Sequence, residues 1–260
     1  MTPDVGKFAP GKIDYDRQSS GYTAGRSLSK EAAAGWSEVI TRHLDGQDVR
    51  TILDLGSGSG RFSPLLADAL GARVVGIEHS RGMRESALRD AEHRGVDYVG
   101  GDGRWVPMGD SSCDAAWTCH VIHHVADRPA FVREISRVVR PSGKALLVGG
   151  FPGRMDDLTM FRFFPESKAV LDQFPTVDEV VSLFEAAGFS YEGLERVTRQ
   201  SCASLAELAQ RASTRADTTL ELISDAAFER GMARLRRAAE AESTPEPVID
   251  SLDMLVFVNG

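Results

Sequence analysis

Residues 51–62, which read TILDLGSGSGRF, decide the fold of this 260-residue chain. A short apolar run leads into three alternating glycines, and a helical pattern follows. Glycine lets the backbone turn sharply and lets a ligand approach closely, because it has no Cβ. The free N–H groups at the start of the next helix attract polar and negative groups. The stretch therefore predicts a strand–loop–helix unit that binds a nucleotide-like or carboxylate-bearing molecule.

The rest of the chain repeats this alternation of strands and helices. A helix that Asp127 caps and Pro141 stops precedes the fifth strand, and a capping-box pattern at Thr176 opens a later helix. Such a chain predicts an α/β fold with a doubly wound, largely parallel sheet covered on both faces. Expected strands are 51–55, 73–77, 96–99, 114–118, 144–148, 191–197 and 252–258; the other expected helices are 29–44, 62–70, 81–93, 204–223 and 225–241.

The second strand ends in a carboxylate, Glu78, twenty residues after Gly58. An acid at this place accepts hydrogen bonds from ribose hydroxyls and repels a 2′-phosphate. The dinucleotide fingerprint would require a third glycine at position 61, where Arg61 stands, and the Gly-Lys-Ser/Thr phosphate loop is absent. Asp54, at the start of the loop, disfavours pyrophosphate and suits a positively charged ligand.

The segment DLGSGSG resembles the first motif of class I S-adenosylmethionine-dependent methyltransferases, and the resemblance extends over residues 51–148. It is similar to the broad small-molecule group that also contains quinone-biosynthesis enzymes. The resemblance implies a Rossmann-like sheet of seven strands, with an N-terminal arm and helix and a helical cap after strand five. It also implies S-adenosylmethionine as the cofactor and a small-molecule methyl acceptor.

Carried over residue by residue, the resemblance places the ribose on Glu78 and the adenine beside Met83 and Asp102-Gly103. Tyr15 and Tyr22 lie in an arm that in the family closes over the cofactor. The full set of predicted cofactor-binding residues is Asp54, Gly56, Ser57, Gly58, Gly60, Glu78, His79, Met83, Asp102, Gly103, Cys119 and Tyr22.

Three histidines follow the fourth strand, where the crevice of a parallel sheet opens. If a protein base takes part, His120, His123 and His124 are the candidates, because histidine titrates near neutrality. His120 is expected nearest the transferred methyl group. The alternative is that these side chains pack or shape the substrate pocket. We predict no metal site, because no distant cysteine or acidic cluster completes a ligand set.

The expected organisation has four parts. Residues 1–48 form the arm and helix, 49–150 the cofactor-binding core, 151–175 a cap, and 176–260 the second half of the core with additional helices. The cap segment holds five of the twelve phenylalanines. These rings either fill the cap's own core or contact an apolar acceptor.

The net charge of −8 makes a nucleic acid an improbable substrate. Three cysteines without a CxxC pair favour a reducing compartment. Without a secretory signal or a membrane-spanning stretch, we expect a cytoplasmic protein. The sequence leaves the oligomeric state open, with a homodimer as the candidate assembly.

Two other functions stay open from the sequence. An NAD-dependent oxidoreductase is opposed by Arg61 and Asp54, as argued above. A non-methylating enzyme that retains the cofactor, such as a cyclase, shares every motif. Small-molecule methylation, in secondary metabolism by analogy with the family, is the leading hypothesis.

Overall fold

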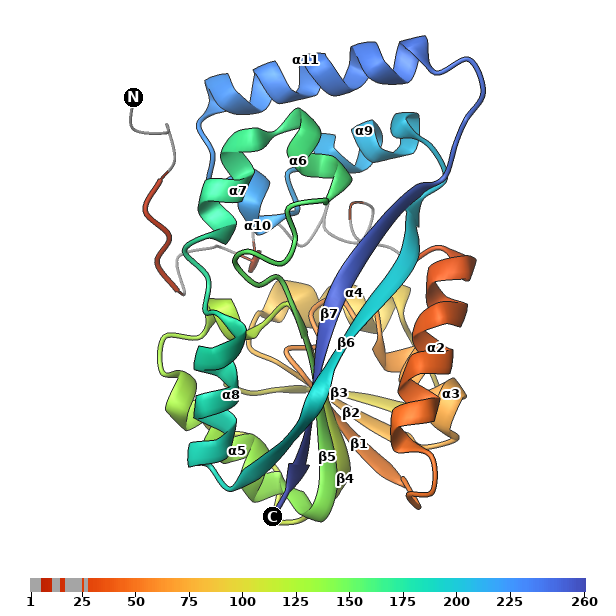
Figure 1. The fold of residues 1–260 in the computed structure, drawn as a ribbon. Helices are drawn as coiled ribbons and strands as arrows, with labels where there is room; N and C mark the ends of the chain where they lie inside the picture. The colour runs from red at the N-terminus through yellow and green to blue at the C-terminus, as the bar shows by residue number, and fades with distance from the viewer. Residues whose placement is uncertain (1–5, 11–14, 17–24, 26–27) are drawn as a thin grey trace.

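The computed structural model describes residues 6–10, 15–16, 25 and 28–260. Seven strands form one sheet in the order β3-β2-β1-β4-β5-β7-β6 (Figure 1). Strands β1 to β5 are parallel, whereas β7 is antiparallel to both β5 and β6. The predicted α/β fold with a mostly parallel, seven-stranded sheet is confirmed. The bounds are β1 Thr51–Leu55, β2 Arg73–Glu78, β3 Val96–Gly100, β4 Cys113–Cys119, β5 Val139–Gly149, β6 Phe189–Cys202 and β7 Val248–Asn259.

Helices cover both faces of this sheet. On β1, Ile52 faces one apolar core and Leu53 faces the other, as the alternation of a strand requires. The first core contains Trp36 of α2, and the second contains Phe131 of α5 and Phe184 of α8. The helices of the sheet layers are α2 Lys30–Leu44, α3 Ser63–Leu70, α4 Arg81–Asp90, the 3-10 turn η1 Ile122–His124, α5 Arg128–Val138 and α8 Val177–Ala186.

The strand order reverses beside β1, because β2 pairs with one edge of β1 and β4 with the other. At such a reversal the connections leave on opposite faces and open a crevice beyond the carboxyl ends of the strands. The glycine loop and the histidine segment follow β1 and β4, so both lie at this crevice.

A cap of four short helices and the long helix α11 gathers beyond the carboxyl ends of the parallel strands (Figure 1). Strand β7 pairs with β5 only from Asp253 onward, while its earlier residues pair with β6 alone. The β6–β7 ribbon therefore extends past the sheet toward the cap. The cap helices are α6 Thr159–Phe163, α7 Pro165–Leu171, α9 Leu205–Ser213, α10 Thr218–Glu221 and α11 Asp225–Ala241.

Several element bounds differ from the sequence prediction. The helix expected over 204–223 is two helices, because Arg215 adopts a positive φ of 51° and Asp217 then caps α10. Strand β5 begins directly after α5, at Val139, rather than at Lys144. Strands β6 and β7 are longer than predicted, because they continue to pair with each other in the ribbon. Among the described residues, no helix is both long and apolar enough to cross a membrane.

Some rings of the Phe-rich segment 151–175 pack in the apolar core of the cap, and others line a space inside it. Phe164 is fully buried and stacks on Phe228 of α11, with ring centroids 5.9 Å apart. Gly231 lies against Phe164, and a Cβ there would clash with the ring. Phe161 and Phe174, by contrast, line a chamber under the cap.

The variant Gly231→Ala should lower the free energy of unfolding by about 1–3 kcal/mol, because an added methyl overpacks the contact with Phe164. Urea denaturation followed by circular dichroism measures this. Gly35→Ala in α2 is the matched control, since a Cβ there meets nothing within 4 Å, and it should stabilise the protein by up to about 1 kcal/mol. Equal stabilities of Gly231→Ala and wild type would contradict the packing described.

Candidate functional site

The glycine loop between β1 and α3 has a backbone that glycine adopts most readily. Gly56, Gly58 and Gly60 have φ angles of 76°, 57° and 80°, which strain other residues. A Cβ at Gly56 would clash with Val121 and one at Gly60 with Tyr98, whereas the space beside Gly58 is open. The loop therefore packs on the protein at two glycines and leaves the third accessible to a ligand.

The carboxylate of Glu78 joins the ends of β1 and β2. The Gly58 N–H donates to Oε2 at 3.1 Å, and the Ser80 N–H donates to Oε1 at 2.8 Å. His79, whose side chain is 68% exposed, places Nδ1 3.0 Å from Oε1. Burial opposes ionisation, but these hydrogen bonds outweigh it and hold the pKa of Glu78 below its usual value. A carboxylate with three donors can accept about one more.

Two further polar groups lie under the loop. Asp54 is 3% exposed and accepts a hydrogen bond from Ser63 Oγ at 2.6 Å. Burial raises the pKa of Asp54 to about 7 despite that hydrogen bond, and the nearby charge of Glu78 acts in the same direction. Ser57 Oγ is buried and has no hydrogen-bond partner among the described residues. Both groups are available to a polar or cationic ligand in the loop.

The residues predicted to surround the adenine are placed around α4 and the loop after β3. Met83 is 1% exposed, in the first turn of α4. Asp102 accepts from Arg104 Nη2 at 2.6 Å and from the Arg104 N–H at 2.9 Å. The Arg104 guanidinium lowers the pKa of Asp102 to about 2. Gly103 lies against Phe131, and a Cβ there would clash with the ring.

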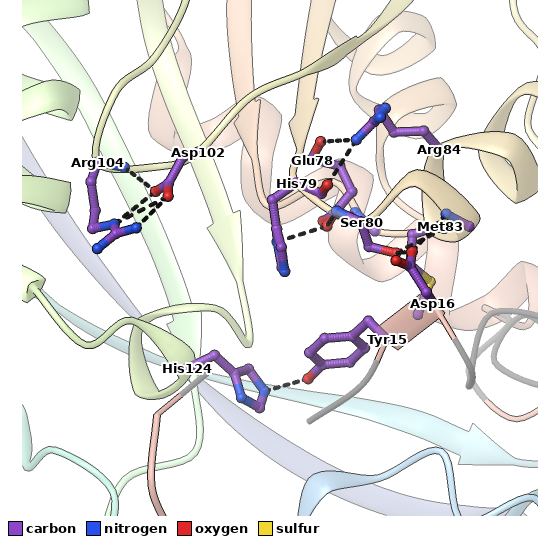
Figure 2. Close-up of polar contacts among 12 residues, drawn as sticks. Tyr15, Asp16, Glu78, His79, Ser80, Met83, Arg84, Asp102, Arg104 and His124 are labelled. Atoms are coloured by element: carbon purple, nitrogen blue, oxygen red, sulfur yellow. Dashed lines mark hydrogen bonds and ion pairs between the residues drawn. The ribbon is translucent and has the colours of Figure 1, made fainter. Parts of the chain in front are cut away.

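Two adjacent residues of the N-terminal arm join the two sides of the crevice. Asp16 Oδ1 accepts hydrogen bonds from Ser80 Oγ at 2.5 Å and from the Gly82 N–H at 2.8 Å. These bonds, that of Ser80 above all, lower the pKa of Asp16. Tyr15 points the other way, and its hydroxyl lies 2.6 Å from His124 Nε2 (Figure 2). The arm thus spans from the end of β2 to the loop after β4.

A chamber of about 180 Å³ lies between this crevice and the cap. His120, His123 and His124 all line it, together with Tyr15 of the arm and Arg61 after the glycine loop. The rest of the lining comes mainly from the cap, from the β6–β7 ribbon, and from the start of α2, where Leu28, Ser29 and Ala32 border the chamber. The structure therefore brings the three predicted histidines together in one chamber with Arg61, the residue that follows the glycine loop.

The three histidines have different surroundings. His120 adopts a positive φ of 58°, and its N–H donates to Val148 O at 2.8 Å. His123 is 3% exposed and stacks on Phe174, with centroids 4.1 Å apart. His124 Nε2 lies near two hydroxyls, those of Tyr15 and of Thr218, the latter at 3.2 Å. The His124 side chain thus has two hydroxyl partners in the chamber that could relay a proton.

Cys119 lies at the carboxyl end of β4, 3.5 Å from Arg61 Nη2. Arg61 also stacks over the Phe62 ring at 4.7 Å. Tyr22, predicted to contact the cofactor, lies outside the described residues. Within the described part of the chain, no group of three or more His, Cys, Asp or Glu side chains is arranged to hold a metal ion.

Sequence reasoning missed several polar residues at this site. Asp16 and Tyr15 are adjacent and contact opposite sides of the crevice. The sequence pattern indicated only the aromatic ring of Tyr15. Arg199, Arg211 and Asp250 line the chamber from the C-terminal half of the chain. No motif marks them, because the ribbon and α9 reach the chamber only through tertiary folding.

Comparisons with known proteins agree with this geometry. Residues 53–147 match the family described as "Methyltransferase domain". A Mycolicibacterium smegmatis protein, described as an S-adenosylmethionine-dependent methyltransferase, is 30% identical over 223 residues, which are 80% of this chain and 80% of that one. The 27-O-demethylrifamycin SV methyltransferase of Amycolatopsis mediterranei is 28% identical over 201 residues, covering 74% of this chain and 73% of that one.

A solved structure of a methyltransferase from an antibiotic biosynthesis pathway of Anabaena variabilis superposes with a TM-score of 0.71 and 19% identity. It covers 91% of this chain and 100% of that one. The chain spans only 28% to 64% of the length of four other curated relatives. The chain belongs to the class I S-adenosylmethionine-dependent methyltransferases.

The ionisation of Asp54 should make the binding of S-adenosylhomocysteine, the product that S-adenosylmethionine leaves after transfer, depend on pH. S-adenosylhomocysteine carries an ammonium group, which favours the ionised carboxylate. Because the pKa of Asp54 is about 7 without ligand, binding below that pH must displace a proton. We expect the association constant to rise by up to about tenfold per pH unit between pH 5.5 and 7, and to level off above.

Calorimetric titration across this range measures the effect. Asp54→Asn should remove the dependence, whereas Asp68→Asn, at an exposed acid of α3, should retain it. The same slope in Asp54→Asn and wild type would show that Asp54 does not face the ligand.

Proposed function

We propose that this protein transfers a methyl group from S-adenosylmethionine to an O, N or C atom of a small acceptor. The observation that carries the proposal is the juxtaposition of two parts. A glycine loop that the buried, ionised Glu78 holds in place leads into Arg61, and Arg61 lines a chamber together with three histidines. The net charge of −8 favours a small molecule over a nucleic acid as the acceptor.

The residues present fit an adenosyl donor that lacks phosphates. Gly58 leaves open space where a side chain would stand, and Ser57 Oγ is buried without a partner among the described residues. Glu78 would accept hydrogen bonds from the ribose hydroxyls, and His79 would lie beside the ribose. Asp54 would face the positively charged end of the donor, and Met83 with Asp102-Gly103 would border the adenine. Gly56 and Gly60 would shape the loop.

When bound, the donor supplies an electrophilic methyl group on a sulfonium. The protein's own part is to hold the acceptor atom in line, and such positioning contributes roughly 7–11 kcal/mol of a barrier. Cys119 and Arg61, at the boundary between loop and chamber, would border the transferred group.

His124 is placed to accept a proton from the acceptor. Its Nε2 faces the hydroxyls of Tyr15 and Thr218, which can relay or hold the proton. His123 is buried against Phe174 and would shape the wall. His120, whose backbone is tied to Val148, would lie beside the reacting atoms.

Two results test the class of reaction. Calorimetry should show binding of S-adenosylmethionine and no binding of NADH. Incubation of the protein with S-adenosylmethionine and phenolic or carboxylic acceptors should yield S-adenosylhomocysteine. Binding of NADH alone would support an oxidoreductase, and conversion of an acceptor without S-adenosylhomocysteine would support a non-methylating enzyme. A relative named for rifamycin methylation supports a setting in secondary metabolism.

Glu78→Gln should weaken binding of S-adenosylhomocysteine by about 1.5–3 kcal/mol, because a charge-assisted hydrogen-bond acceptor is lost. Isothermal titration calorimetry measures this. Glu85→Gln, at an exposed acid on α4, is the control and should bind as wild type does. If Glu78→Gln also binds with unchanged affinity, the ribose does not lie on this carboxylate.

His124→Ala should reduce the rate of S-adenosylhomocysteine formation by about 10²–10⁴-fold, the usual contribution of a general base. Its affinity for S-adenosylhomocysteine should stay at the wild-type value. Tyr15→Phe should give a smaller loss, and His93→Ala, which removes a histidine paired with Asp68 at the surface, should give none. Undiminished turnover in His124→Ala would remove this histidine from the chemistry.

A further inference from the structure

Asp16 is an exposed residue of the arm to which methyl transfer itself gives no role, yet the protein holds its carboxylate at two points. Its Oδ1 accepts hydrogen bonds from Ser80 Oγ at 2.5 Å and from the Gly82 N–H at 2.8 Å, both at the start of α4 (Figure 2). The free N–H groups and the dipole at the start of a helix attract a carboxylate. Asp16 therefore anchors this point of the arm on α4.

The anchor point on α4 is itself held in place. Ser80 is 4% exposed and caps α4, because its Oγ accepts the N–H of Met83 at 3.1 Å. The N–H of Ser80 donates to Glu78. A hydroxyl has a single proton to donate, and Ser80 donates it to Asp16. The Ser80 side chain therefore cannot rotate away from Asp16 without losing the cap of α4.

Tyr15, the residue before Asp16, contacts His124 in two ways. Its hydroxyl lies 2.6 Å from Nε2, and its ring meets the imidazole edge-on, with centroids 5.3 Å apart. The Thr218 hydroxyl lies 3.2 Å from the same nitrogen. In neutral histidine Nε2 either donates or accepts one proton, so the two hydroxyls compete for it. The place of the Tyr15 side chain thus decides which hydroxyl holds the ring of His124.

The anchor and the tyrosine are joined by one peptide bond. Their Cα atoms are therefore only about 3.8 Å apart, and a movement of Asp16 away from α4 moves Tyr15 with it. A hydrogen bond to a hydroxyl weakens steeply beyond about 3 Å. A displacement of about 1 Å would thus be enough to transfer Nε2 of His124 from Tyr15 to Thr218.

An earlier part of the arm is fixed on the cap. The Phe8 ring packs on Phe174, with centroids 5.0 Å apart, and the Phe8 N–H donates to Gln173 Oε1 at 2.9 Å. The arm is thus attached to the cap at Phe8 and to α4 at Asp16. Of these two attachments, Asp16 is the one directly adjacent to Tyr15.

We propose that Asp16 is a positioning residue, which through its hydrogen bonds to Ser80 and Gly82 places the Tyr15 hydroxyl on Nε2 of His124. The proposal deepens the proposed function and rests on the role given there to His124. It assigns to Asp16 an effect on this histidine, exerted through Tyr15, and no contact with the donor or the acceptor.

Nuclear magnetic resonance of the full chain, with nitrogen-15 in its histidines, tests this, because the spectra report the state of both nitrogens of each ring. The chain has six histidines, and the signals that vanish in His124→Gln identify His124. Tyr15→Phe should move the Nε2 signal of His124, because the hydroxyl is removed. Asp16→Ala should move it in the same direction, because the hydroxyl then leaves the nitrogen. Asp97→Ala, at an exposed acid of β3, should leave it at the wild-type position.

Two further variants separate positioning from a general loosening of the structure. When Asp16→Ala is added to Tyr15→Phe, the signal should not move further, because Asp16 acts only through Tyr15. Asp16→Asn keeps an oxygen acceptor for Ser80 and Gly82 and should give a smaller shift than Asp16→Ala. In turnover, Asp16→Ala should lower the rate of S-adenosylhomocysteine formation by about tenfold, the effect of one net hydrogen bond, and by no more than Tyr15→Phe does.

A wild-type Nε2 signal in Asp16→Ala would overturn the proposal, and so would an additive shift in the double variant or an unmoved signal in Tyr15→Phe. Because Asp16 is exposed, its replacement leaves no cavity, and unchanged signals of His43 and His93, which lie in ion pairs elsewhere, verify the fold of each variant. Failure of the proposed function has a different signature. The protein would then form no S-adenosylhomocysteine, whereas the spectra are recorded without donor or acceptor and report the contact between Tyr15 and His124 directly.

Discussion

The architecture of the site depends on one buried carboxylate. Glu78 ends β2 and accepts the N–H of Gly58, from the loop that ends β1. This bond fixes the loop against the neighbouring strand, and the N–H of Ser80 adds the start of α4 to the same centre. Because hydrogen bonds keep the group ionised despite burial, one negative charge both organises the loop and remains available to a ligand.

The rest of the site is arranged around this centre in two layers. On one side, Asp16 ties the arm to Ser80 and to the first turn of α4. On the other, Tyr15 carries the same arm to His124 and so to the chamber. Tyr15 and Asp16, which are adjacent in the chain, therefore contact both sides of the crevice, and Tyr15 also lines the chamber.

The sequence predicted the parts of this site that are local in the chain. Strand, glycine loop, helix and strand-end acid follow one another within residues 51–78, so their geometry follows from short-range rules. The histidines after β4 were predicted for the same reason. The chamber wall at Arg199 and Arg211 was not predicted. It forms only where β6 and β7 extend beyond β5 as a two-stranded ribbon and approach α9. The split of residues 204–223 into α9 and α10 likewise depends on one positive φ at Arg215, which nothing in the local pattern indicates.

A crystal structure of the protein with S-adenosylhomocysteine would test the role of Glu78 most directly. Both ribose hydroxyls should lie within hydrogen-bond distance of the Glu78 carboxylate, and the sulfur should face the chamber lined by His120 and His124. A ligand bound elsewhere, or a ribose turned away from Glu78, would contradict the central claim.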